Sequence, residues 1–450
     1  RPTRGAALGL AARLRLIQAS PLWNGGEAAR KTFGTWKRST DNVNYVSQTP
    51  DEKKWAVAAM ACKRIIDMNA YSLHTVPRLP TSYPLPANVS NLPFPDGAGD
   101  IDPFMSYSDM FTGESLPMKN SEYLWGRTSS GLTSSTRYSF PITNLGGLNC
   151  LGVTQKIVDA YLMADGRTID NSSAEYPYAV TGFMDGSDRT FSGYRLRNTV
   201  SKMYVNREMR FYASIGFSEC YWTCSSTSDN NRKNQTVTYH LDGNSGKQGT
   251  NNNPNNYPIT GYVLKKFIHA DDAWDGTNAK RIDKAFPIIR YAEILLSYVE
   301  ALNNLTGAHT VQYGEEDGQS YTLTRDVDEM RKYFNMVRFR AGLPGLTDDE
   351  LASASTMQAL VERERMVELL FENRRFYDVR RWGKYESTEN EPVMGMDVES
   401  TRTGGYYSAV PVNHSRARNR VVDRKLILFP IELNEVRKAP SMDQNPGYQN

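Results

Sequence analysis

The sequence predicts a mainly α-helical fold in which two groups of helices flank a large irregular insertion. Helical periodicity is clear near both ends of the 450-residue chain and weak between about 75 and 280. Clusters of Pro, Gly, Asn and Ser interrupt that middle part. At 39% hydrophobic and 23% charged residues, the chain can bury a sizeable core. We therefore expect packed helices that carry a loop-rich region with short strands.

Two helices are expected near the start of the chain. Residues 3–19 combine small alanines, which let a neighbouring helix approach closely, with leucines that supply apolar area. Apolar residues also repeat every three or four positions after Thr49-Pro50-Asp51-Glu52. Thr49 is the predicted cap of this second helix, with Pro50 at its first helical position. We expect the two helices to pack against each other.

The middle part is expected to be ordered, because roughly 200 structureless residues do not occur inside a compact protein. Short aromatic or β-branched runs, such as 210–215 and 235–239, alternate there with turn-forming clusters. We predict short strands, small helices and long ordered loops, inserted between helical layers and presenting a surface.

Helical periodicity returns in three further stripes. They cover 287–307, 327–342 and 357–376, and glycines stand at the ends of the first two. Because the connections are short, these helices must lie against one another. Together with the first two they predict helix-turn-helix units of tetratricopeptide type, at a spacing too irregular for a simple tandem array.

Charge and cysteine content exclude several classes of protein. The balance of 53 Lys and Arg against 50 Asp and Glu does not favour binding to nucleic acid. No run of 18 apolar residues is present, and the four cysteines lack zinc spacing. No phosphate loop, dinucleotide motif or nucleophile elbow is found. The 11% of aromatic residues, including 26 Tyr, is instead typical of a recognition surface.

The densest charge pattern lies at 361–382, where Glu364, Glu368 and Glu372 fall four residues apart on one helical face. Two of these carboxylates could form the acid/base pair of a glycoside hydrolase. However, the segment also holds six arginines, which bind carboxylates bidentately and keep them ionised. An ionised carboxylate cannot act as a general acid. We therefore favour a structural role for the three glutamates.

Four ordered motifs resemble those of the SusD/RagB family. Residues 287–301 (PIIRYAEILLSYVEA) resemble the R-x-AE-x-x-L-x-x-AEA helix of that family, and 335–344 (NMVRFRAGLP) its N-x-VR-x-RAGLP segment. Residues 362–382 are similar to the signature ER-x-x-EL-x-FE-x-x-R-x-x-DLRRW, and 429–448 to the tail PIP…QNPGY. The resemblance implies a tetratricopeptide-like scaffold that binds ligand through the irregular region opposite.

The resemblance also implies a place and a partner. Members of the family are Bacteroidetes cell-surface lipoproteins, anchored in the outer membrane by a lipidated N-terminal Cys. They sit over a SusC-like TonB-dependent transporter and deliver glycans, or in some cases peptides, to that pore. The lipidated Cys and the first helical unit of the family are not found here, and the first residue is Arg1 rather than Met. We therefore expect a processed or truncated product.

Aromatic side chains of the insertion are the candidate ligand contacts. The C–H faces of sugars stack on aromatic rings, while sugar hydroxyls reach amides and carboxylates. Each Trp has the alternative role of a core anchor. The candidates are Tyr221, Trp222, Tyr123, Trp125 and Trp274.

Two further features bear on the chemistry of the insertion. Cys220 and Cys224 flank Tyr221 and Trp222 and could close a small disulfide loop in an oxidising exterior. The Asp-Gly pairs at 165–166 and 185–188 carry oxygen ligands that could hold a structural calcium ion. Because Asp-Gly pairs are more often plain turns, we expect no metal and no other cofactor to be required.

The sequence therefore predicts a non-enzymatic, glycan-capturing lipoprotein in four parts. These are an N-terminal scaffold part (1–74), a ligand-binding insertion (75–280), a C-terminal scaffold part (281–386) and an extended segment packed on the scaffold (387–450). The alternatives are a glycoside hydrolase that uses paired carboxylates, a peptide-binding member of the family, and a helical-repeat adaptor that binds only protein.

Overall fold

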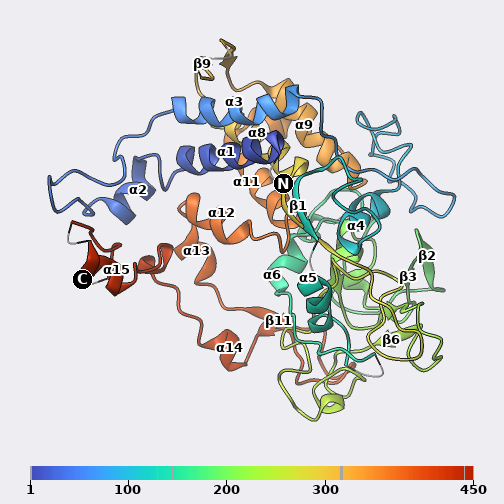
Figure 1. Ribbon diagram of the computed structural model, residues 1–450. Coiled ribbons are helices and arrows are strands. Elements are labelled where there is room, and N and C mark those ends of the chain that lie inside the picture. Colours follow the sequence, from blue (N-terminus) through green and yellow to red (C-terminus); the bar gives the residue numbers. More distant parts are fainter. Residues whose placement is uncertain (1–2, 129, 143–144, 315–317, 440, 449–450) are drawn as a thin grey trace.

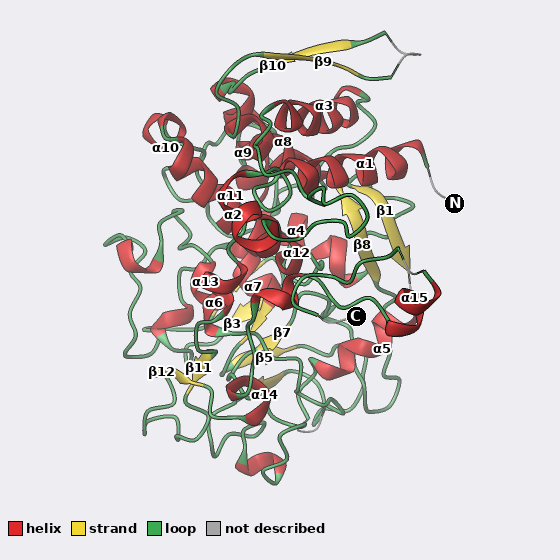
Figure 2. Ribbon diagram, turned by 90° about the vertical axis from the view of Figure 1, so that its left-hand side faces the viewer, coloured by secondary structure: helices red, strands yellow, loops and turns green. Residues whose placement is uncertain are grey.

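The structure is a computed structural model that describes residues 3–128, 130–142, 145–314, 318–439 and 441–448. Helices gather at one end of the molecule, and loops with short strands dominate the other end (Figure 1 and Figure 2). Within the described ranges, no helix is both long and apolar enough to cross a bilayer.

The α-helices vary from single turns to four turns and are α1 (Arg4–Ala19), α2 (Gly26–Phe33), α3 (Lys53–Asp67), α4 (Pro103–Thr112), α5 (Ser130–Ser135), α6 (Gln155–Ala160), α7 (Met209–Ser214), α8 (Tyr291–Asn303), α9 (Val327–Arg340), α10 (Asp348–Ala352), α11 (Ala354–Glu368), α12 (Arg375–Arg381), α13 (Tyr385–Glu389), α14 (Ser415–Arg418) and α15 (Leu433–Lys438). The strands are all short and are β1 (Tyr123–Thr128), β2 (Arg189–Phe191), β3 (Tyr194–Leu196), β4 (Ile215–Gly216), β5 (Cys220–Trp222), β6 (Gln235–Val237), β7 (Val263–Leu264), β8 (Ala285–Arg290), β9 (His309–Gln312), β10 (Ser320–Leu323), β11 (Met394–Met396) and β12 (Ala409–Pro411). In the described part of the chain these strands pair only in two-stranded antiparallel sheets. The predicted fold class, mainly helical with short strands in an irregular region, is confirmed.

The helical scaffold combines helices from both ends of the chain. Helix α1 packs on α3, α3 packs on α8, and α8 also contacts α9 and α11 (Figure 1). Every residue of α8 is buried, as expected for a helix surrounded by others. Gly9 lets α1 also approach the β1–β8 strand pair closely, since a Cβ at Gly9 would meet the Ile289 and Leu124 side chains of these strands at 3.1 Å. The expected packing of these helices against one another is confirmed.

The loop-rich region has a hydrophobic core of its own, which is rich in aromatic rings. Tyr204 and Phe217 stack with ring centroids 4.4 Å apart, and Phe211 stacks on Phe217 at 5.4 Å. Such ring pairs hold long loops in place although few backbone hydrogen bonds are regular. The run 210–215 lies mostly in helix α7, whereas 235–237 form strand β6.

Two predicted helix starts are wrong. Helix α3 begins at Lys53 rather than near Pro50, because the Asp51 carboxylate accepts the Lys53 N–H at 3.0 Å in place of a Thr49 cap. The segment from Pro287 to Arg290 is strand rather than helix, and α8 starts only at Tyr291. The β-branched residues of this segment pair with β1, so tertiary pairing decided the conformation there.

The helix predicted over 357–376 is in fact two helices. Helix α11 ends at Glu368, and α12 starts at Arg375. Between them Phe371 and Asn373 have positive φ angles of 59°, which no helix accommodates. This turn carries Glu372 away from the helix axis toward buried cations.

Those cations belong to a buried ion-pair lattice that joins the scaffold to the loop-rich region. Its centre is Glu368, whose carboxylate contacts Arg210 at 2.8 Å, Arg290 at 2.7 Å and also Arg340. Burial by itself raises the pKa of Glu368, but the three guanidinium groups outweigh burial and hold that pKa far below its ordinary value. The lattice comprises Glu122, Glu208, Glu364, Glu368, Glu372, Arg210, Arg290, Arg340 and Lys266, all of them buried.

The end of the chain returns to its beginning. The Trp36 indole Nε1 donates to the Gln444 backbone oxygen at 3.1 Å, and the Tyr45 hydroxyl donates to the Asp443 carboxylate at 2.6 Å. The segment after α13 therefore runs along the loop-rich region and ends against the residues that follow α2.

Candidate functional site

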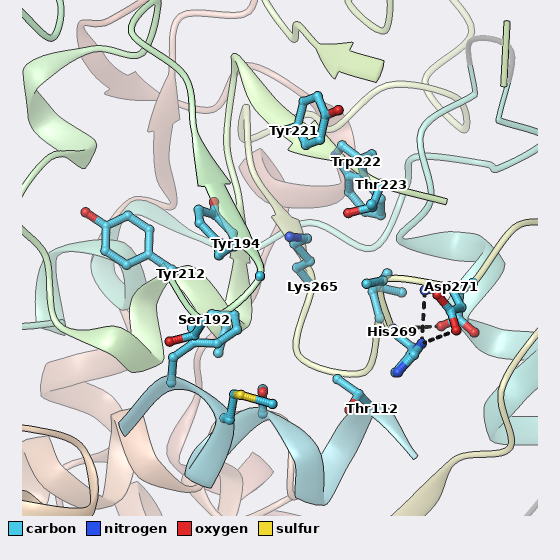
Figure 3. Close-up of a pocket in the computed structure, with 18 of the residues that line it drawn as sticks. Thr112, Ser192, Tyr194, Tyr212, Tyr221, Trp222, Thr223, Lys265, His269 and Asp271 are labelled. Atoms are coloured by element: carbon cyan, nitrogen blue, oxygen red, sulfur yellow. Dashed lines mark hydrogen bonds and ion pairs between the residues drawn. The ribbon is translucent and has the colours of Figure 1, made fainter. Parts of the chain in front are cut away.

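A cavity of about 340 Å³ in the loop-rich region is the candidate site (Figure 3). Its walls come from α4, the β2–β3 hairpin, α7, β5 and the segment 265–272 after β7. The volume lies at the lower end of the range of small-molecule sites, which extends from about 300 to 1,000 Å³. The site therefore draws on segments that are far apart in the sequence.

Aromatic rings form one wall of this cavity. Tyr194 comes from β3, Tyr212 from α7, and Tyr221 with Trp222 from β5. The Trp222 ring packs behind the surface against Phe140, with centroids 5.0 Å apart, and only 2% of Trp222 is exposed. Tyr221 is half-buried and is the more accessible of the two β5 rings.

A two-residue turn positions Tyr194. Ser192 and Gly193 connect β2 to β3 with positive φ angles of 50° and 76°, the pattern of a type I′ hairpin. The Ser192 hydroxyl donates to the Asp102 carboxylate at 2.6 Å, and Asp102 also caps α4 through the Met105 N–H at 2.9 Å. One carboxylate thus holds the hairpin and the helix on either side of the cavity together.

Two buried lysine–carboxylate pairs hold the segment 265–284. Lys266 donates to Glu372 at 2.7 Å, and Lys284 pairs with the fully buried Asp272 at 2.7 Å. Burial lowers the pKa of Lys266 to about 8, although Glu372 opposes this shift. The neighbouring residue Lys265 faces the cavity.

Two cations lie beside the aromatic wall. The Lys265 Nζ is 4.7 Å from the centroid of the Tyr194 ring and 5.6 Å from that of Trp222 (Figure 3). The Arg195 guanidinium is 5.1 Å from the Tyr221 centroid, and its Nε donates to Asp188 at 2.8 Å. Both contacts are at cation–π distance.

The other side of the cavity is acidic. The Asp271 backbone N–H donates to His269 Nδ1 at 2.9 Å, so Nε2 is the ring nitrogen that donates to Glu114, at 2.5 Å. Asp109 on α4 is half-buried, and burial raises the pKa of its carboxyl to about 6 against a hydrogen bond from Ser108. These oxygens can accept hydrogen bonds from ligand hydroxyl groups.

The cavity unites two of the residues predicted as ligand contacts. Tyr221 and Trp222 line it. Tyr123 and Trp125 lie on β1 and Trp274 lies in the 265–284 segment, and none of these three is part of its wall.

The three residues outside the cavity have different environments. Tyr123 is buried, with its hydroxyl donating to the Met110 oxygen at 2.6 Å, whereas Trp125 is 38% exposed. Trp274 is half-buried with the Arg281 guanidinium 5.0 Å from its centroid. Their role as ligand contacts stays a prediction.

Sequence reasoning missed most of the cavity wall. Tyr194 could have been found, because Ser192-Gly193 between two short aromatic runs is a hairpin signal. Nothing local distinguishes Lys265, Asp109 or His269 from other polar residues of the insertion. Only the folded structure, in which these three side chains line one cavity, identifies them as parts of the site.

Cys220 and Cys224 are free thiols in the structure rather than a disulfide. Burial raises the pKa of the Cys224 thiol to about 12, so this group stays protonated at neutral pH.

The aspartates considered for calcium have other partners. Asp185 pairs with Lys202 at 2.9 Å, and Asp188 pairs with Arg195 at 2.7 Å. Asp165 accepts a hydrogen bond from Ser173 at 2.6 Å. Across the described ranges, no group of three or more His, Cys, Asp or Glu residues is placed to hold a metal ion. A structural calcium ion stays a prediction.

Comparison with known proteins decides the family. A family model described as the SusD family matches residues 121–448, well over half of the chain. This chain belongs to the SusD family. The predicted family membership is confirmed, and the motifs at 287–301, 335–344, 362–382 and 429–448 all lie within the matched residues.

Solved structures of SusD-like proteins share the fold. The protein BT4246 matches with a TM-score of 0.73 and 23% identity, over 99% of this chain and 73% of that one. A SusD-like protein of Bacteroides fragilis (BF3747) matches with a TM-score of 0.61 and 21% identity, over 100% of this chain and 66% of that one. A SusD-like carbohydrate binding protein of the same species (BF0978) gives a TM-score of 0.58 at 15% identity, over 98% of this chain and 65% of that one. No curated protein matches the chain.

Proposed function

We propose that this SusD-family chain captures a glycan in the cavity and delivers it, uncleaved, to a SusC-like TonB-dependent transporter. The observation that carries the proposal is the cavity itself, where the half-buried Tyr221 ring, backed by the buried Tyr194 and Trp222, stands opposite hydrogen-bonding groups of α4 and the segment 265–272. Sugar rings stack on aromatic faces and direct hydroxyls to such groups. The carbohydrate binding reported for one solved SusD-like protein supports the same ligand class.

The proposed role is capture rather than hydrolysis. Glu364, Glu368 and Glu372 are all at most 4% exposed and are saturated by arginine and lysine contacts in the lattice. A carboxylate enclosed in such contacts does not reach a substrate, and the guanidinium groups around Glu368 lower its pKa, which is the opposite of what a general acid needs. The lattice therefore supports a structural role for the acids that suggested a glycoside hydrolase.

Family membership supports a placement on the cell, which is part of the proposal. The chain would work at the outer face of the outer membrane of a Bacteroidetes cell, anchored by an N-terminal lipid and supporting polysaccharide utilisation. In this arrangement the helical scaffold faces the transporter and the cavity faces the glycan. The peptide-binding and protein-adaptor alternatives differ in ligand and are separated by the binding experiment.

Isothermal titration against a panel of oligosaccharides tests the proposal. At least one glycan is expected to bind the purified protein, and Tyr221→Ala is expected to weaken its binding about fivefold, because a stacked ring contributes on the order of 1 kcal/mol. Tyr377→Ala is the matched control, since Tyr377 is 51% exposed on α12 and lies outside the cavity. Release of shortened sugars during prolonged incubation would contradict capture, and binding of peptides alone would favour that alternative.

A further inference from the structure

Lys265 is the cavity's one cation that has no anionic partner within the described residues. Arg195 pairs with Asp188, and the His269 ring lies between the Glu114 and Asp271 carboxylates. The Lys265 backbone N–H donates to the Ser214 oxygen at 2.7 Å, which holds the chain in place, but its Nζ makes no hydrogen bond or ion pair in the described ranges. An uncompensated positive charge thus remains at the aromatic wall.

The partly enclosed position of Lys265 increases the attraction that its charge exerts on an anion. Lys265 is half-buried, and its Nζ lies near both the Tyr194 and the Trp222 ring (Figure 3). A cation held over aromatic faces in a partly enclosed site is screened less than one on an open surface. An anion that enters the cavity therefore gains more from this lysine than from a surface lysine.

Of the acidic side chains that line the cavity, Asp272 is paired with a lysine, Lys284. Glu114 accepts a hydrogen bond from His269, and Asp271 accepts one from the Ser225 hydroxyl. Asp109 on α4 accepts one from Ser108. His269 and Asp271 lie on the side of the cavity away from Tyr194, so the cavity has a basic aromatic end and an end of hydrogen-bond acceptors (Figure 3).

The geometry points to an anionic sugar, a ring that carries a carboxylate or sulfate group, as the ligand of this cavity. The anion lies against Lys265, the ring packs on Tyr221, and hydroxyl groups donate to the acceptors around His269 and Asp109. A volume of about 340 Å³ holds on the order of one or two sugar rings, so the cavity receives a short piece or an end of a chain. This inference rests on the proposed glycan capture and specifies its ligand.

The experiment compares each acidic oligosaccharide with its neutral counterpart. Wild type is titrated with uronate oligosaccharides of pectate and alginate and with their methyl esters, which remove the charge and keep the ring. Chondroitin sulfate oligosaccharides and their desulfated forms separate sulfate from carboxylate. Cello- and malto-oligosaccharides and an alanine tripeptide complete the panel. We expect at least one acidic form to bind tenfold or more tightly than its neutral counterpart, with a preference that weakens as salt rises.

Variants assign the preference to Lys265. Lys265→Met keeps the side-chain length and removes the charge, so it is expected to abolish the preference for the acid by weakening binding of the acidic form tenfold or more relative to that of the neutral form. Lys265→Arg is expected to retain the preference. Lys247→Met is the matched control, because Lys247 pairs with Glu399 at 2.7 Å and lies outside the cavity wall.

Each outcome decides between the two proposals. Equal binding of acidic and neutral forms, or an equal loss of both in Lys265→Met, overturns the anionic ligand and leaves glycan capture intact. Binding of the tripeptide without any glycan overturns both. The wild-type comparison stands by itself, so a poorly folding variant does not remove the test.

Discussion

At the scale of residues, regular spacing in the sequence does not determine where a side chain lies in the fold or which partner it has. Glu364, Glu368 and Glu372 have the regular spacing of one helical face, yet Glu372 lies beyond the end of α11 in a turn. Each of the three is neutralised by cations that come from other elements, such as Arg210 and Arg290. The expected structural role is supported, but the partners are not the arginines of 361–382, because two of those, Arg365 and Arg381, pair with Asp378 instead.

Replacing the central carboxylate of the lattice should be costly. Glu368→Gln leaves three buried guanidinium groups with one anion fewer, so we expect a loss of about 3–5 kcal/mol in the free energy of unfolding. Chemical denaturation with urea measures it. Glu362→Gln is the control, because Glu362 pairs with the 46%-exposed Lys384 and should lose less than about 1 kcal/mol. Equal losses in the two variants would refute a structural role of the lattice.

Asp109 should make stability depend on pH. Its folded-state pKa, raised by burial from 3.8 to about 6, exceeds the unfolded value. This group therefore favours the folded state fully below pH 4, and that stabilisation is lost as pH rises through 6. Asp109→Asn removes this term, so the stability of the variant relative to wild type should increase between pH 4 and pH 7. Urea denaturation at both pH values measures the change, and a constant difference would contradict it.

At the scale of elements, partners decided the conformation wherever local signals were ambiguous. The segment 285–290 continues an apolar stripe that predicts helix, but its residues pair with β1, and Arg290 is held by the lattice in extended backbone. The cavity hairpin shows the reverse case. Ser192-Gly193 is a local turn signal strong enough to define β2 and β3.

A side chain at Gly193 should strain the turn of this hairpin. A Cβ at φ 76° costs about 1 kcal/mol, although no neighbouring atom lies within 4 Å of the place that the Cβ would take. We expect Gly193→Ala to lower stability by that amount and to weaken glycan binding, because Tyr194 follows directly. Gly307→Ala is the matched control, since its site is equally open and has no positive φ. Thermal denaturation and titration with the same glycan measure the two effects.

At the scale of the whole molecule, two cores are tied together by buried charge. The scaffold core includes Leu295 and Phe334, and the aromatic core of the loop-rich region includes Phe211 and Tyr204. Arg210 on α7 reaches Glu364 and Glu368 on α11, across the boundary between these two cores. Because breaking either core would leave these ions unpaired, the two should unfold together.

A single unfolding transition is therefore expected. Tryptophan fluorescence, to which Trp222 contributes from the loop-rich region, and far-ultraviolet circular dichroism, which reports the helices, should give coincident urea midpoints. In Glu368→Gln the midpoints should separate. Separate transitions already in wild type would show that the lattice does not couple the cores.

Local patterns in the chain were enough to predict the helical class, the approximate position of the scaffold helices, the family and the structural use of the arginine-rich stretch. These features depend on hydrophobic periodicity and on motifs whose residues lie close together in the sequence. Three-dimensional packing was needed to find that Pro287 begins no helix, that Glu372 lies in a turn, and that Tyr221 and Trp222 share a cavity with Tyr194 and Lys265. These features depend on strand and ion-pair partners separated by many residues. Because such partners are invisible in any local window, only the folded chain reveals how they set backbone conformation and bring the cavity wall together.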